Sequence, residues 1–197
     1  MPRLRFETAR DLLDAYPAAS DELLIEPVDT PSLRFLAELS GQQPIDKAIG
    51  FCAYLLPRRE AVWWGCQSVR ALAPPDNREA AALRIAEEWV HKPEEEQRLN
   101  ALAIGRQSNY RAATTWLALG AGWAGPSMPP GSLAGFEGAV PPADDAWLPI
   151  PPDYTAKAVR SGILIAASKL APQQRTELLK RCVAEGSRLA AGESAPT

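Results

Sequence analysis

Apolar side chains recur every three or four positions along most of the chain, which is the spacing of amphipathic helices. The pattern is clear in residues 31–40 and again in residues 44–56. No segment shows the sustained alternation of apolar and polar residues that a half-buried strand requires. The β-branched residues are scattered among alanine, leucine, glutamate and arginine, which favour helices. The sequence therefore predicts an all-α protein.

Prolines at helix starts and glycines at helix ends mark the boundaries of these helices. Thr8 is placed to cap a first helix, Thr30 is followed by a proline at a first helical position, and Gly41 closes that helix. His91 falls in a last turn, where a cation is favoured, and the glutamates at 94–96 fall in a first turn, where carboxylates are favoured. We expect eight to nine helices over residues 9–15, 31–40, 44–56, 57–73, 76–91, 93–105, 110–124, 153–170 and 172–191, with a short turn towards residue 25.

One long interruption separates these helices. Residues 126–152 hold eight of the 19 prolines, so no regular element is expected to run through them. They also hold too many apolar residues for a free linker, and we expect an ordered loop along the surface with Trp147 buried. The prediction is a single compact domain over residues 5–191, followed by a flexible tail at 192–197.

The most apolar stretch, residues 112–124, is about 13 residues long, and a membrane span needs roughly 20. We interpret it as a buried core helix whose glycines, with Gly125 just beyond, allow close packing. No apolar run follows the basic residues at the N-terminus, which argues against a signal peptide. Cys52, Cys66 and Cys182 show no CxxC spacing and are expected to be free, buried thiols. We therefore expect a cytoplasmic protein without a membrane span.

Composition narrows the function classes. The 197 residues carry a formal net charge of −3, and a general nucleic-acid binder would need a basic field. One histidine and three dispersed cysteines rule out most familiar metal sites. We expect no metal, no cofactor and no nucleic-acid partner. The expected partner is another protein, and an oligomer is an open possibility.

The densest segment for chemistry is residues 57–66, PRREAVWWGC. On a helix that continues to residue 73, one arc contains Val62, Gly65, Cys66, Val69, Leu72 and Ala73. A ridge with Trp63 at its centre falls opposite this arc. Tryptophan and arginine dominate binding hot spots, so it is the candidate binding surface. The candidate residues are Arg59, Trp63, Gln67 and Arg70, together with neighbouring Arg58.

Two other interpretations of this segment stay open. Both tryptophans are core residues in the first, with cation–π contacts at the edge. In the second, Glu60 and Cys66 are reacting groups, although a helix separates them by roughly 120° around its axis. We lean towards a covered Trp63 with Arg59 and Arg70 exposed.

Residues 51–66, FCAYLLPRREAVWWGC, resemble the central motif of an uncharacterised family of proteobacterial proteins. Further matches follow in the same order: residues 86–90 with Pro93, residues 116–125, residues 133–152 and residues 156–159. The resemblance covers most of residues 45–190. Residues 121–125, AGWAG, depart from the family pattern, in which an aromatic, a tryptophan, a serine and one or two glycines are expected. The resemblance implies no established activity, and it implies an accessory role near type VI secretion genes.

Three function classes follow. The favoured hypothesis is a non-catalytic accessory protein of the adaptor, chaperone or immunity type. A structural subunit of a larger assembly would instead show a broad apolar surface patch. A small enzyme or ligand-binding protein would use Arg58, Arg59, Glu60 and Cys66, and it would require a pocket with Cys66 exposed.

Overall fold

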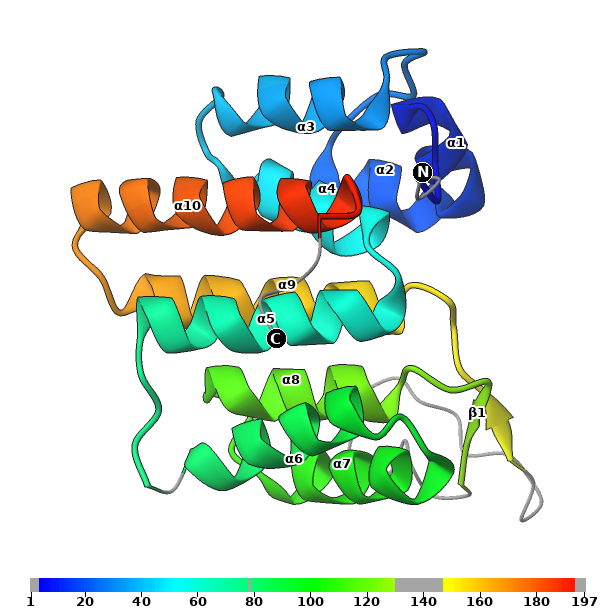
Figure 1. Cartoon of the computed structure of the whole chain (residues 1–197), viewed down its shortest axis with the longest axis vertical. Coiled ribbons are helices and arrows are strands. Elements are labelled where there is room, and N and C mark those ends of the chain that lie inside the picture. The colour runs from blue at the N-terminus through cyan, green and yellow to red at the C-terminus, as the bar shows by residue number, and fades with distance from the viewer. Residues whose placement is uncertain (1–3, 78, 130–146, 194–197) are drawn as a thin grey trace.

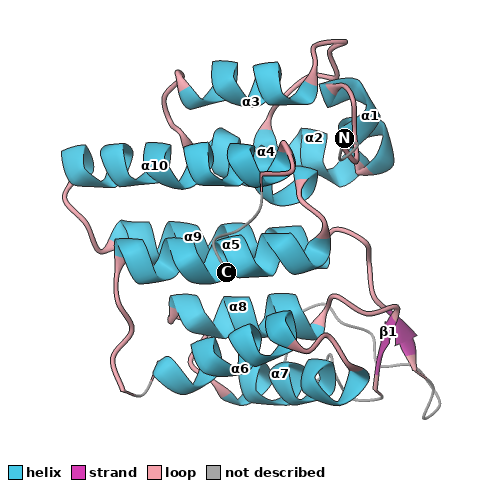
Figure 2. Ribbon diagram, in the orientation of Figure 1, coloured by secondary structure: helices cyan, strands magenta, loops and turns pink. Residues whose placement is uncertain are grey.

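The computed structural model describes residues 4–77, 79–129 and 147–193. Within them the chain forms a single all-α domain with one minimal two-stranded sheet, as predicted (Figures 1 and 2). The helices are α1 (Ala9–Ala15), α2 (Pro17–Leu23), α3 (Ser32–Ser40), α4 (Asp46–Leu55), α5 (Arg58–Leu72), α6 (Ala80–His91), α7 (Glu95–Gln107), α8 (Ala113–Gly122), α9 (Tyr154–Ser168) and α10 (Pro172–Ala190).

The helices stack in layers, with α5 and α9 side by side at mid-height (Figure 1). Above them α4 and α10 form the next layer, which α3 covers. Below them α8 packs on both α5 and α9, and α6 and α7 close the lower end. α5 therefore contacts both halves of the molecule.

The first two helices show how capping sets the boundaries. Thr8 and Asp11 form a reciprocal capping box that starts α1. α2 is a helix where only a turn was expected, because Pro17 occupies a first helical position whose amide needs no partner. It ends at Leu24, which has a left-handed backbone (φ 51°). This helix brings the described total to ten, one or two more than predicted.

The proline-rich segment contains regular structure that the sequence did not predict. β1 (Ser127–Met128) pairs antiparallel with β2 (Leu148–Pro149) at one end of the molecule (Figure 2). Trp147 is 50% exposed, so the expectation that it is buried is wrong. Side chains alternate along an extended chain, and Ile150 turns inwards while Trp147 and Pro149 turn outwards. The remaining expectation of an ordered loop falls on residues 130–146, outside the described residues, as does the tail from 194.

α8 is the predicted core helix. Of its ten residues, only Trp116 is not buried. A Cβ added at Gly122 would lie 2.7 Å from the Cα of Leu102, so only glycine lets α7 approach α8 this closely. The expected role of glycine in close packing is confirmed here.

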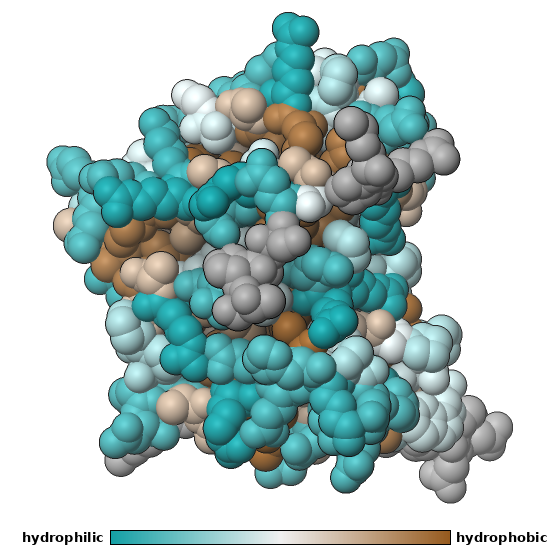
Figure 3. Space-filling view, viewed as in Figure 1, coloured by the Kyte–Doolittle hydropathy of each residue, from teal (hydrophilic) through white to brown (hydrophobic). Residues whose placement is uncertain are grey.

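One main hydrophobic core runs from α1 to α10, and a smaller cluster forms around Leu119 and Trp123 beside the sheet. The face seen in Figure 3 is mostly hydrophilic, with small hydrophobic patches beside α3 and α10. Among the described residues, no helix has the length and apolar character that crossing a membrane requires.

Candidate functional site

α5 forms where the sequence predicts it. Pro57 precedes its first residue, Glu60 lies in its first turn and Arg70 in its last, which matches the helix dipole at both ends. The arc assigned to the core is buried from Val62 to Leu72, whereas Ala73, which follows the last residue of the helix, is partly exposed. Trp64, on the flank of that arc, is fully buried, so the core extends around more than half of the helix.

Arg59, Trp63, Gln67 and Arg70 form the candidate binding surface, which we call the α5 ridge. It runs along the junction of α5 with α6, and each of its arginines contacts α6. Arg59 Nε donates a hydrogen bond to the carbonyl oxygen of Val90 at 2.7 Å. Arg70 forms a two-pronged ion pair with Glu87, with both N···O distances 2.8 Å. The hydrogen bond from Arg70 to Glu87 raises the pKa of the guanidinium. These contacts fix the direction of both side chains.

The rest of the ridge is partly open to solvent. Trp63 is half-buried and packs against the core, while Gln67 is exposed. Arg59 is exposed, and the side chain of Arg70 is 49% exposed although it is paired. The expected exposure of the two arginines is confirmed, and Trp63 lies between the covered and exposed alternatives.

The two arginines of the ridge differ in available bonding capacity. Glu87 neutralises Arg70, so this position adds little net positive charge. In the described part of the chain only Nε of Arg59 has a partner, which leaves both terminal nitrogens unpaired. Arg59 is therefore an anchored guanidinium with free donors beside a half-buried tryptophan.

Arg58 has a different environment from the ridge. Its Nη1 donates to the carbonyl oxygens of Ala124 at 2.9 Å and Gly125 at 3.2 Å, and its Nη2 reaches the carbonyl oxygen of Pro152 at 3.5 Å. The side chain thus joins both ends of the proline-rich segment to the start of α5. Sequence reasoning could not find this role, because the acceptors are backbone atoms 66 to 94 residues away.

The alternative with Cys66 as a reacting group loses its support. Cys66 is fully buried, and burial raises the pKa of its thiol, so the reactive thiolate is disfavoured. Glu60, by contrast, is exposed to solvent. All three cysteines are free and buried, as expected.

Two buried polar groups escaped sequence reasoning. Arg98, only 3% exposed, pairs with Glu95 and donates to the carbonyl oxygens of Gly122 and Ser127. Its guanidinium occupies the space that a side chain at Gly125 would need, which explains that glycine. The only sequence signal was a lone arginine on an otherwise ordinary helix face.

The second group links α2, α4 and α9. Glu22 accepts hydrogen bonds from the hydroxyl of Tyr54 at 2.8 Å and from Arg160 at 2.9 Å. Burial and the neighbouring Glu22 carboxylate raise the pKa of Tyr54. Because Arg160 neutralises Glu22, the cluster can be half-buried, and its contacts hold the three helices together.

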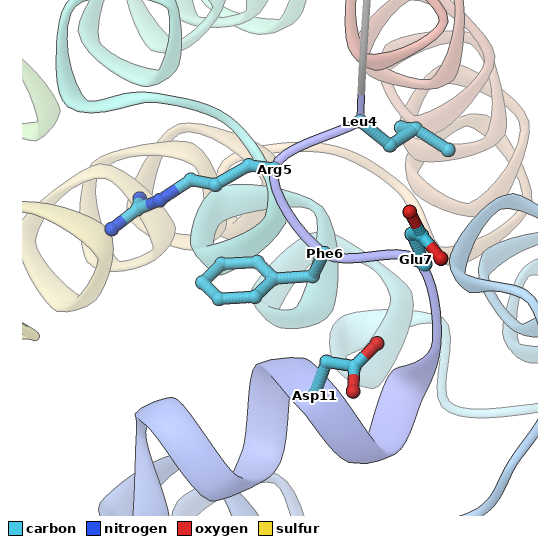
Figure 4. Close-up of a pocket in the computed structure, with 5 residues that line it drawn as sticks. All are labelled: Leu4, Arg5, Phe6, Glu7 and Asp11. Atoms are coloured by element: carbon cyan, nitrogen blue, oxygen red, sulfur yellow. The ribbon is translucent and has the colours of Figure 1, made fainter.

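A hollow of about 350 Å³ lies beside the N-terminal segment, lined by the residues labelled in Figure 4. Its polar groups already have partners within the fold. Arg5 donates to the hydroxyl of Tyr16 and stacks on Phe6, while Asp11 caps α1 through Thr8. The arrangement orders the start of the chain against α1.

The described residues bring together no group of three or more His, Cys, Asp or Glu side chains placed to hold a metal ion. Comparisons with curated proteins and with solved structures gave no match. A family model does match residues 35–190, which span the α5 ridge and every element from α4 to α10. The chain therefore belongs to DUF6931, a family of unknown function.

Proposed function

We propose that this chain is a non-catalytic accessory protein of bacteria, of the adaptor, chaperone or immunity type, which binds another protein through the α5 ridge. The observation that carries the proposal is Arg59, whose side chain is held by the carbonyl oxygen of Val90 while its terminal nitrogens stay unpaired among the described residues. An anchored donor loses little side-chain entropy when a partner binds.

The chemistry of the partner follows from the ridge. Two free terminal nitrogens of one guanidinium match a carboxylate bidentately. Trp63, half-buried beside Arg59, offers a rigid apolar surface of the kind found in binding hot spots. The proposed partner therefore presents an aspartate or glutamate next to an apolar side chain.

The cellular context rests on the sequence resemblance. It favours a proteobacterial protein that acts in the cytoplasm beside the type VI secretion machinery. The α5 ridge is consistent with such a role, because an adaptor or immunity protein needs a preformed surface for one partner. The alternative of a structural subunit stays open.

The test is a pull-down of the tagged protein from its native bacterium, followed by quantitative mass spectrometry. Gln67→Glu is the central variant, because it keeps the size of an exposed side chain and places a carboxylate on the ridge, one turn from both Trp63 and Arg70. Gln174→Glu, also exposed but on α10, is the matched control. The proposal expects a stoichiometric partner that the wild type and Gln174→Glu retain and that Gln67→Glu loses.

Arg59→Gln and Trp63→Ala extend the test, because each removes one of the two side chains proposed to contact the partner. Arg59→Gln removes one hydrogen bond to a carbonyl, worth about 1–3 kcal/mol of folding stability, so the protein stays folded while the carboxylate contact disappears. A partner captured equally by wild type, Gln67→Glu and Arg59→Gln would place the binding surface elsewhere. No stoichiometric partner at all would contradict the adaptor hypothesis itself.

A further inference from the structure

Leu24, at the end of α2, is the most exposed large hydrophobic side chain among the described residues, at 76%. Its backbone is left-handed (φ 51°), and no other non-glycine residue in the described part of the chain has a positive φ. A left-handed backbone costs free energy at any residue with a Cβ, and a side chain this exposed gains little from burial. Glycine would remove the cost and give up little, so stability alone does not favour a leucine here.

Hydrogen bonds on both sides fix the backbone that presents this side chain. The amide of Leu24 donates to the carbonyl oxygen of Ser20, and its carbonyl oxygen accepts from Lys47 Nζ at 2.7 Å. The amide of Ile25 also donates to the carbonyl oxygen of Ser20 at 3.2 Å, and Ser20 Oγ donates to the carbonyl oxygen of Ile25 at 2.6 Å. Because the backbone is already fixed, a partner that covers Leu24 orders little of the chain on binding.

Two exposed carboxylates flank Leu24. Asp21 lies three residues earlier on α2 and therefore one helical turn away, and Glu26 follows two residues later. Neither carboxylate has a hydrogen bond or an ion pair within the described residues. We call Asp21, Leu24 and Glu26 the α2 tip. Even with the Lys47 ammonium beside it, the α2 tip carries a net negative charge.

The α2 tip complements the α5 ridge in charge and in spacing. The tip presents a free carboxylate and an apolar side chain one helical turn apart, Asp21 and Leu24. The ridge presents the free terminal nitrogens of Arg59 and the half-buried indole of Trp63, also one turn apart. A carboxylate on the guanidinium therefore brings the leucine to the tryptophan. Within one copy, α2 packs on α4 and the ridge lies at the junction of α5 with α6, so a contact between the two surfaces needs two copies (Figure 1).

We propose that the α2 tip of one copy docks head to tail on the α5 ridge of a second copy. Asp21 pairs with Arg59, and Leu24 packs on Trp63. The inference rests on the proposed function, since it names a second copy as the partner of the same ridge. The contact is small, so the association is weak, with a Kd of roughly 0.1–1 mM. One copy of the pair keeps a free ridge and the other a free tip, so further copies add or the assembly closes.

The test is sedimentation equilibrium of the purified protein between about 0.05 mM and about 2 mM. The average mass of the wild type is expected to rise with concentration. Leu24→Gly, which lacks the apolar group of the tip, and Arg59→Gln, which lacks the guanidinium of the ridge, are each expected to weaken association at least about tenfold. Arg181→Gln, which removes an exposed arginine from α10, is the matched control and should associate like the wild type. Leu24→Gly should keep or raise the melting temperature, because glycine adopts the left-handed backbone without strain.

A mixture of the two variants distinguishes this contact from other kinds of self-association. A Leu24→Gly copy still has an intact ridge, and an Arg59→Gln copy still has an intact tip. Mixed in equal amounts, the two variants are expected to form a one-to-one dimer and nothing larger, because only one of the possible contacts joins two intact surfaces.

The inference is overturned if the wild type stays monomeric over this range, if either variant associates like the wild type, or if the mixture stays monomeric. None of these results overturns the proposed function, because the pull-down from the bacterium can still identify a different protein at the ridge. The proposed function fails separately, if that pull-down yields no stoichiometric partner or if Gln67→Glu and Arg59→Gln retain the partner.

Discussion

Trp64 joins α5 to α10 inside the main core. It is fully buried on α5, and its indole Nε1 donates to the carbonyl oxygen of Cys182 on α10 at 2.8 Å. Gly186, one turn further along α10, leaves the space that the ring occupies. Trp89 on α6 is 6% exposed and belongs to the same core. Trp64 and Trp89 are therefore both core residues.

Trp64→Ala and Trp89→Ala are each expected to lower the free energy of unfolding by about 3–5 kcal/mol, because each leaves a large cavity. Trp64→Ala should cost more, since it also removes the hydrogen bond from the indole to the Cys182 carbonyl. Chemical denaturation followed by circular dichroism measures both values. A loss below about 1 kcal/mol would show that the side chain is not part of the core.

The ion pair between Glu95 and Arg98 is expected to weaken at low pH. The hydrogen bond from Arg98 lowers the pKa of the Glu95 carboxyl, so this pair stabilises the fold above the pKa of an unfolded glutamate, about 4.3. The stabilisation is lost as the pH falls through the lower folded pKa. Because the side chain of Glu95 is 57% exposed, we expect less than about 1 kcal/mol.

Glu95→Gln is expected to be less stable than the wild type at pH 7 and to lose less stability between pH 6 and pH 3. Glu177→Gln, which removes an exposed pair with Arg181, is the control. Denaturation curves across this pH range measure the difference. Identical pH dependence in Glu95→Gln and the wild type would contradict the assignment.

At the scale of elements, the junction between α5 and the proline-rich segment depends on Arg58. Its guanidinium bonds to carbonyl oxygens at both ends of the segment, and the amide of Ile150 bonds to the carbonyl oxygen of Pro126 at 3.0 Å. Arg58 thereby supports the β1–β2 pair, which has only two residues in each strand.

Arg58→Gln is expected to speed hydrogen exchange of the Ile150 amide about tenfold, because charge-assisted bonds to carbonyls are worth about 1.5–3 kcal/mol. Amides in the centres of α5 and α9 should keep their protection. Exchange followed by NMR distinguishes the two regions, with Arg181→Gln as the control. Unchanged exchange at Ile150 would show that the segment is held without Arg58.

The helix boundaries show where local sequence patterns are enough to predict the start of a helix. Helices α1, α3 and α10 begin where a cap or proline predicts, because these signals act through neighbouring residues. α6 begins four residues later than predicted, and α8 begins three residues later. Before α8, Asn109 holds a turn through its own backbone and side chain, which the spacing of apolar residues does not reveal.

At the scale of the whole molecule, the all-α class followed from the sequence because helical periodicity is repeated in almost every segment. The arrangement of the site did not follow. The partners of Arg58, Arg59 and Arg98 include backbone carbonyls 24 to 94 residues away, and such acceptors carry no residue signature. The β1–β2 pair was missed for a related reason, since two-residue strands are too short to show alternation.

The central claim is that the α5 ridge contacts a partner protein, and site-specific photocrosslinking in the native bacterium tests it most directly. A photoreactive phenylalanine analogue replaces exposed Gln67 in one strain and exposed Gln174 on α10 in the other. We expect one partner protein to crosslink at position 67 and not at position 174, and we expect Arg59→Gln to abolish this crosslink. Crosslinking to the same proteins from both positions, or to none from position 67, would contradict this claim.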